Sequence, residues 1–227
     1  MSPLSRPNDS MPADFAPRMS ALLAEMRRNM DGVTAEAMYN AGVRGLLNYG
    51  VGIPAIRRIA REAGKDHQFA KFLYRQQVRE LRMAAVSVAE PERVTADELA
   101  FWLEGSPATE LLDELAMQLI SRTLQPVLDA VVGQWLEDGD PAARYAAMMS
   151  LARAREYDKG RTLAAMAAAV GESPDDMRLA HGAVTLAASV AAADGSCIRQ
   201  IRGIAAALAD SGPAGRHFAE EIDWMIA

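Results

Sequence analysis

Apolar residues recur at helical spacing along most of this chain. Phe15, Leu22 and Met26 fall on one face of a helix predicted over residues 13–29. A second stripe follows the i, i+3, i+7, i+10 pattern of a helix face: Val78, Leu81, Ala85, Val88. Several stripes are wide enough to face two neighbouring helices, and no stretch alternates apolar and polar residues as a strand would. The pattern predicts an all-α fold.

A repeated phrase divides the sequence into units of similar length. Trp-Leu-Glu ends an apolar stretch at Trp102 and again at Trp135, 33 residues later. In each copy a glycine follows, and a Ser or Asp then stands before a proline, which is typical of a helix end followed by a capped helix start. Such starts are predicted at Pro107, Pro141 and Pro174. Because this spacing matches one helical hairpin per repeat, we expect an α-α superhelix, a HEAT- or armadillo-like solenoid of about six antiparallel helix pairs.

Length and composition fit one helical domain. The chain has 227 residues, 50% of them apolar, and a formal charge of −6. We expect residues 1–12, which are polar and proline-rich, to form a loose leader, and residues 13–227 to form a single HEAT-like repeat domain. No apolar run is long enough to predict a membrane span, and the single cysteine, Cys197, excludes an intrachain disulfide, so we expect a cytoplasmic protein. The three histidines are scattered, and we expect neither a metal nor a cofactor.

Charge is distributed unevenly along the sequence. Residues 40–82 contain nine basic and three acidic side chains, whereas residues 84–140 contain two basic and twelve acidic ones. Four basic residues lie within three turns of one predicted helix and could bind the phosphates of nucleic acid: Arg57, Arg58, Arg61, Lys65. The alternative is a solvated helix face that Glu62, Asp66 and Glu80 partly neutralise.

Three stretches of the sequence resemble one protein family. Residues 49–60, Tyr-Gly-Val-Gly-Ile-Pro-Ala-Ile-Arg-Arg-Ile-Ala, look like the signature near the start of the bacterial alkylpurine-DNA glycosylases of the AlkD type, which are HEAT-like helical solenoids. Residues 79–85 resemble the helix in which that family packs successive repeats, and residues 135–151 resemble one of its later repeats. The similarity covers most of the chain, from about Met19 to Asp210.

This resemblance implies DNA alkylation repair. It implies a concave, positively charged surface that holds duplex DNA, for which we expect contacts from seven residues: Arg57, Arg58, Arg61, Lys65, Arg79, Arg82, Arg144. It also implies an alkylpurine DNA N-glycosylase reaction without deep base flipping, in which a carboxylate, here Asp113, stabilises the developing sugar cation. The basic residue that follows the family's acidic turn falls on Arg144, or on Tyr145 if the alignment slips by one.

The chain departs from the family at two aromatic positions. Thr109 stands where the family has a tryptophan four residues before the carboxylate, and Ala183 stands at its later tryptophan. Because these aromatic walls are missing, we expect glycosylase activity to be weak or absent. Trp102, Trp135 and Tyr145 could replace them, but their places in apolar stripes favour packing in the core.

Several of these features have a second interpretation. Asp113 lies beside Glu110 and Glu114 and also fits an acidic helix face. The alanine-rich face that includes Ala183 and Ala187 fits either close helix packing or a groove widened by the missing tryptophan. For the whole chain, the alternative is a non-enzymatic solenoid adaptor that binds a protein partner on its concave face.

Overall fold

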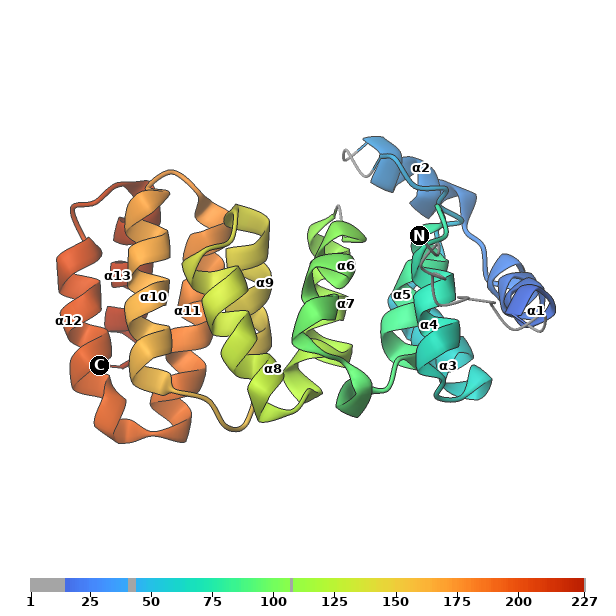
Figure 1. Cartoon of the computed structure of the whole chain (residues 1–227). Coiled ribbons are helices and arrows are strands. Elements are labelled where there is room, and N and C mark those ends of the chain that lie inside the picture. Colours follow the sequence, from blue (N-terminus) through green and yellow to red (C-terminus); the bar gives the residue numbers. More distant parts are fainter. Residues whose placement is uncertain (1–14, 41–43, 107, 227) are drawn as a thin grey trace, which may run out of the picture. The chain divides into compact units, whose positions relative to one another are not determined.

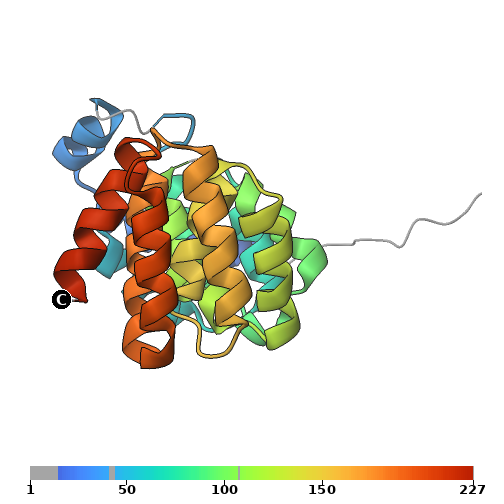
Figure 2. The same ribbon diagram turned by 90° about the vertical axis from the view of Figure 1, so that its left-hand side faces the viewer.

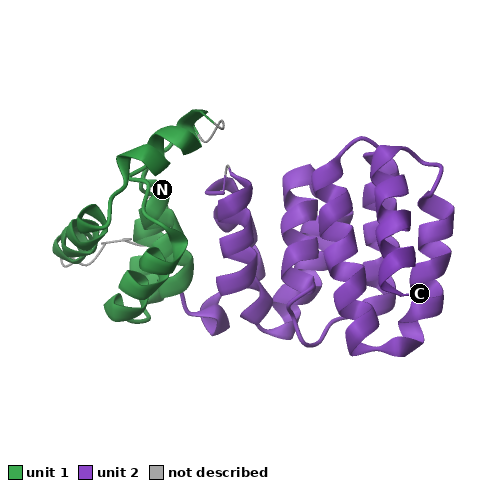
Figure 3. Cartoon of the chain, turned by 180° about the vertical axis from the view of Figure 1, so that it is seen from behind, with its two compact units in different colours: residues 1–88 green, residues 89–227 purple. Residues whose placement is uncertain are grey.

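The structure, a computed structural model, describes residues 15–40, 44–106 and 108–226. These residues form helices and connecting turns without a strand, apart from one isolated bridge between Leu47 and Val78. The chain divides into two compact units, residues 1–88 and 89–227 (Figure 3). The predicted leader and the predicted helix start at Pro107 lie outside the described residues. The predicted all-α fold is confirmed.

Unit 1 is organised around α5 (Arg79–Val88). Every residue of this helix except one is buried. Both α3 (Ile53–Ala63) and α4 (His67–Tyr74) pack against α5, and α1 (Phe15–Arg28) packs against α3 and α4 (Figure 1). Within unit 1, α5 is therefore the central helix.

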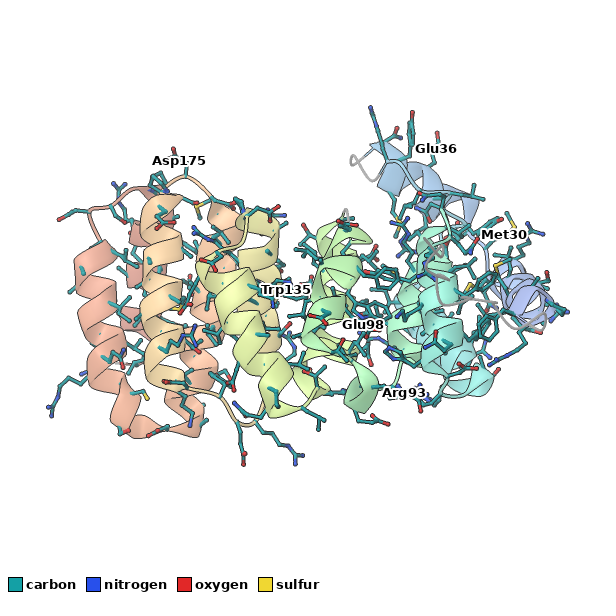
Figure 4. All side chains as sticks on the ribbon, in the orientation of Figure 1. Met30, Glu36, Arg93, Glu98, Trp135 and Asp175 are labelled. Carbon is teal, nitrogen blue, oxygen red and sulfur yellow. The ribbon has the colours of Figure 1, made fainter. Side chains whose placement is uncertain are left out.

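The remaining helix of unit 1, α2 (Gly32–Asn40), has no buried residue. Its start is fixed by Asp31, whose side chain accepts hydrogen bonds from the backbone N–H groups of Val33 and Thr34 at 3.0 and 3.3 Å. Tyr39 and Val33 are exposed, and Glu36 is labelled on this helix in Figure 4. Capping rather than burial therefore defines α2.

Unit 2 stacks its longer helices in two layers (Figures 1 and 2). In one layer each helix packs against the next in the order α7 (Thr109–Gln118), α9 (Pro141–Leu151), α11 (Met177–Ala193), α13 (Pro213–Met225). The other layer contains α8 (Gln125–Ala130) continued by η4 (Val131–Glu137), then α10 (Lys159–Glu172), then α12 (Ile198–Leu208). Shorter elements complete the unit: η1 (Pro91–Arg93), η2 (Ala96–Glu98), α6 (Leu99–Glu104), η3 (Ile120–Arg122), η5 (Gly195–Cys197).

Consecutive helices from the two layers form antiparallel pairs. The helix α8–η4 packs on α9, α10 packs on α11, and α12 packs on α13. Asp175, in the turn between α10 and α11, lies at the upper ends of the helices of unit 2 in Figure 4, and the connection from α9 to α10 lies at their lower ends (Figure 1). One pair per repeat is the arrangement that the spacing of Trp102 and Trp135 predicts.

The core of unit 2 contains both tryptophans of the repeated phrase. Trp102 is 0% exposed and Trp135 is 2% exposed, so the interpretation of both as core residues is confirmed. On α11, Ala183 and Ala187 are also buried. A side chain added at the neighbouring Gly182 would place its Cβ 3.2 Å from atoms of Met148 and Tyr145 on α9. The small face of α11 therefore serves close packing rather than a widened groove.

The predicted helix starts are right in one case and wrong in another. Asp140 accepts a hydrogen bond from Ala143 N at 2.8 Å and caps α9 at Pro141, as predicted. The start predicted at Pro174 is wrong, because Asp176 caps α11 instead, accepting from Arg178 N at 2.9 Å. Pro174 lies in the preceding turn, where its carbonyl accepts a hydrogen bond from Ala214 N at 2.8 Å and so fixes the start of α13.

Candidate functional site

The basic residues predicted on one helix do lie together on α3 of unit 1. This helix turns Ile56 and Ile59 into the core. Arg58 and Arg61 are exposed, and Arg57 is half-buried. Arg58 is paired with Glu62 at 3.0 Å within the helix. Part of the α3 charge is thus neutralised locally, and the charge of Arg61 faces solvent.

Lys65, just beyond α3, is exposed but makes a structural contact. Its Nζ donates a hydrogen bond to the backbone carbonyl of Ser87 at 2.8 Å. The ammonium group carries three N–H donors, and this bond uses one of them. Lys65 therefore keeps its charge at the surface beside the end of α3.

Arg79 and Arg82, also predicted to contact DNA, are buried in α5. Arg79 Nη1 lies 3.1 Å from Glu80 Oε1 and donates to Val51 O at 3.1 Å. Arg82 Nε donates to Gln76 O at 2.8 Å, and burial lowers the pKa of its guanidinium. Both side chains bind backbone carbonyls, of Val51 and Gln76, so their contact with DNA stays a prediction.

The buried pair fixes the glycine-rich loop that leads into α3. Glu80 Oε1 accepts hydrogen bonds from Tyr49 N at 3.1 Å and Val51 N at 3.3 Å. Between them, Gly50 has φ +72°, and a Cβ there would lie 2.0 Å from Asp31 O. Only glycine fits this position, because any side chain would collide with backbone. The loop, and with it the first turn of α3, is therefore positioned by α5.

Arg144 lies in unit 2, away from the residues of α3 in the sequence and in a separate compact unit. Its Nη2 is 2.7 Å from Glu172 Oε2 and donates to Glu137 O at 3.2 Å. Glu137 ends η4 and Glu172 ends α10, so the guanidinium lies at the carbonyl ends of two helices. This position explains a cation in the first turn of α9, because the favourable ends of two other helix dipoles offset the unfavourable end of its own.

Asp113 contacts Tyr145, not Arg144. The Tyr145 hydroxyl on α9 donates a 2.8 Å hydrogen bond to Asp113 Oδ1 on α7. Burial and the adjacent Asp113 carboxylate raise the pKa of the Tyr145 phenol well above its usual value. On the next helix of the same layer, Arg178 Cζ lies 5.7 Å from the centre of the Tyr145 ring. A carboxylate, a phenol and a guanidinium therefore meet along three successive helices.

Sequence reasoning did not find Arg178, although a signal for it exists. Tyr145 follows Asp113 by 32 residues, and Arg178 follows Tyr145 by 33. These spacings equal the repeat period, so the three residues occupy equivalent places in successive repeats. A search for polar residues at the repeat spacing would have brought them together.

This arrangement can stabilise positive charge at a fixed point. The hydrogen bond to Tyr145 uses Oδ1 and orients the Asp113 carboxylate. A carboxylate held in a half-buried position attracts a cation more strongly than one in bulk water, because screening is weaker there. The described residues include no cluster of three or more His, Cys, Asp or Glu side chains that could hold a metal ion. No described helix is both long and apolar enough to cross a membrane.

Comparison with known proteins decides the family. A family model described as DNA alkylation repair enzyme matches residues 22–191. The chain belongs to this DNA alkylation repair family. The resemblance seen in the sequence is thereby confirmed. A search of curated proteins finds no match to this chain.

A solved structure has a similar fold. It is described as belonging to "a new family of proteins related to the HEAT-like repeat DNA glycosylases with affinity for branched DNA structures". The TM-score is 0.70 at 17% sequence identity, and the match covers 90% of this chain and 94% of that chain. The likeness confirms the HEAT-like helical repeat fold that the sequence predicts for this member of the DNA alkylation repair family.

Proposed function

We propose that this member of the DNA alkylation repair family associates with DNA through α3. The observation that carries the proposal is the division of that helix into two faces. Ile56 and Ile59 are buried, and Arg58 and Arg61 are exposed beside the half-buried Arg57. Exposed guanidinium groups bind phosphates by charge and by paired N–H donors. The branched-DNA affinity of the structurally similar family supports testing branched as well as linear DNA.

The test replaces Arg57, Arg58 and Arg61 together by glutamine. We expect weaker binding of linear and branched duplex DNA, and a salt dependence whose slope falls by about 0.9 for each phosphate that the variant no longer neutralises. A matched control replaces three exposed arginines of α12 and α13, Arg199, Arg202 and Arg216, and so removes the same charge. Equal losses of affinity in both variants would leave α3 without a specific role. No binding by the unmodified protein would refute DNA association and favour the adaptor alternative.

We further propose that glycosylase activity is weak or absent. Thr109 and Ala183 provide no aromatic wall, while Asp113 remains able to stabilise a sugar cation. The test measures release of free base from methylated duplex DNA by the unmodified protein and by Asp113→Asn. We expect slow release that the substitution abolishes, or none from either protein. Rapid release that persists in Asp113→Asn would contradict the role of this carboxylate.

A further inference from the structure

Unit 2 contains a pocket lined by basic residues near the ends of α7 and α9. A pocket of about 720 Å³ lies between the turn that precedes α8 and the connection from α9 to α10. Three arginines, Arg122, Arg153 and Arg155, line it, together with Glu156. Two of them belong to a segment that begins after α9 ends at Leu151, and Arg122 ends η3. Separate parts of the chain therefore bring three guanidinium groups to one concavity.

None of the three arginines forms an ion pair with another described residue. Arg153 donates one hydrogen bond, from Nη1 to Met149 O at 2.8 Å, which leaves most of its five N–H donors unused. Two other arginines of unit 2 are compensated, since Arg144 is paired with Glu172 and Arg161 with Glu137. Uncompensated positive charge at a concave surface favours an anionic ligand.

The pocket continues the faces that carry the Asp113–Tyr145 pair. Met117, which also lines it, follows Asp113 by one helical step of four residues on α7, and Ser121 lies just beyond the end of that helix, in η3. Arg153 follows Tyr145 by eight residues, two of them beyond the end of α9 at Leu151, and its charge partly opposes the rise in the pKa of the Tyr145 phenol. Eight residues of helix span on the order of 12 Å, so the pocket and the carboxylate lie within a few nucleotides' length of each other.

We propose that the pocket lined by Arg122, Arg153 and Arg155 binds a backbone phosphate of DNA close to the nucleotide that Asp113 faces. Guanidinium groups match phosphate because their planar N–H donors can bond two oxygens at once. Glu156, which also lines the pocket, opposes the anion and limits the affinity. This inference rests on the proposed association with DNA, and it assigns unit 2 its own phosphate contact.

The test compares Arg122→Gln/Arg155→Gln with the unmodified protein in duplex binding at several salt concentrations. Neither side chain makes a hydrogen bond to another described residue, so the fold should survive. We expect affinity to fall by about tenfold and the slope of log K against log salt to fall by about 1 to 2. The control, Arg199→Gln/Arg216→Gln, removes the same charge from α12 and α13 and should change both quantities much less.

Removing a negative charge from the pocket tests the same proposal in the opposite direction. Glu156→Gln should strengthen duplex binding by a few-fold, because it removes negative charge from the lining of the pocket, whereas Glu220→Gln on α13 should not. Unchanged affinity in Arg122→Gln/Arg155→Gln, with the unmodified protein still binding duplex, would overturn this inference alone. No binding by the unmodified protein would instead overturn the proposed function itself.

Inorganic phosphate serves as the second probe. If it raises the melting temperature of the unmodified protein and not of Arg122→Gln/Arg155→Gln, while both bind duplex equally, the pocket takes free phosphate and the proposed DNA contact is wrong. If excess phosphate reduces duplex binding by the unmodified protein, and does so beyond the effect of chloride at equal ionic strength, the proposal is supported.

Discussion

The two units of the chain fix their backbone by different interactions: a buried ion pair in unit 1 and close helix packing in unit 2. In unit 1, the buried pair of Arg79 and Glu80 holds the loop from Tyr49 to Val51. In unit 2, α9 packs directly against α11, and Gly182 lets the two helices approach closely. Charges of unit 2 such as Arg144 and Glu172 lie nearer the surface.

This difference follows from the backbone that each unit has to fix. A loop has N–H and C=O groups that no helix satisfies, so unit 1 buries charged side chains to bond them. Stacked helices satisfy their own backbone, so the contact of α9 with α11 in unit 2 depends on complementary surfaces. A buried charge should therefore be the sensitive point of unit 1, and added volume the sensitive point of unit 2.

The largest expected effect is that of Glu80→Gln in unit 1. The substitution leaves the Arg79 guanidinium buried without its carboxylate, which should lower the free energy of unfolding by about 3 kcal/mol. Urea denaturation measures this change. Glu62→Gln on the exposed face of α3 is the control and should change stability by less than about 0.5 kcal/mol. Equal effects of the two substitutions would show that the pair does not hold the loop.

In unit 2, Gly182→Leu should cost about 1–3 kcal/mol, because the added side chain forces α11 away from Met148 and Tyr145. Thermal unfolding followed by circular dichroism measures the destabilisation. Gly203→Leu on α12 is the matched control, since an added Cβ there meets no atom within 4 Å. Leucine favours a helix more than glycine does, so the control should be neutral or stabilising.

Tyr145→Phe tests the polar contact within that close packing. Removal of the hydrogen bond to Asp113 should cost about 1 kcal/mol at neutral pH. Because the pKa of Tyr145 is raised in the folded protein, the unfolded chain loses this proton first, and stability should fall as the pH rises above about 10. The decline should be shallower in Tyr145→Phe. Tyr157, whose pKa burial raises to about 12, contributes equally to both proteins and cancels in the comparison.

The smallest effect should come from the ion pair near the surface of unit 2. Arg144→Gln should cost no more than about 1 kcal/mol, because Glu172 is largely exposed and water replaces its partner. Glu172→Gln removes the same pair but leaves the bond of Arg144 to Glu137 O. A double-mutant cycle separates the two contacts. If the coupling energy between Arg144 and Glu172 exceeded that between Arg79 and Glu80, the surface pair would be the stronger one and the comparison of the two units would be wrong.

The sequence predicted regular features better than local exceptions. The all-α fold and the start of α9 follow from apolar spacing and from Asp140 before Pro141, and both are confirmed. The start at Pro174 was wrong because Asp176 offers a capping oxygen two residues later, a competition that the pattern does not rank. Periodicity also does not reveal that Arg79 is buried, since one of its partners, the carbonyl of Val51, belongs to a loop far away in the sequence.

The candidate site shows the same limit. The family resemblance points to Asp113, but the sequence does not pair it with Tyr145, which it offers as an alternative to Arg144 or as an aromatic residue of the core, and it does not point to Arg178. Contacts between repeats depend on how the helices are rotated about their axes, which one stripe of apolar residues does not determine. The repeat spacing supplies that information when polar residues are compared between repeats.

The close approach of α9 and α11 bears on how this chain could change by mutation. Ala183, at the place of the family's later tryptophan, is 0% exposed, and its neighbour Gly182 already touches α9. An indole at residue 183 would need space that only smaller side chains on the facing helices could release. A tryptophan could therefore not be installed there by one substitution, and an evolutionary path toward it would pass through destabilised intermediates.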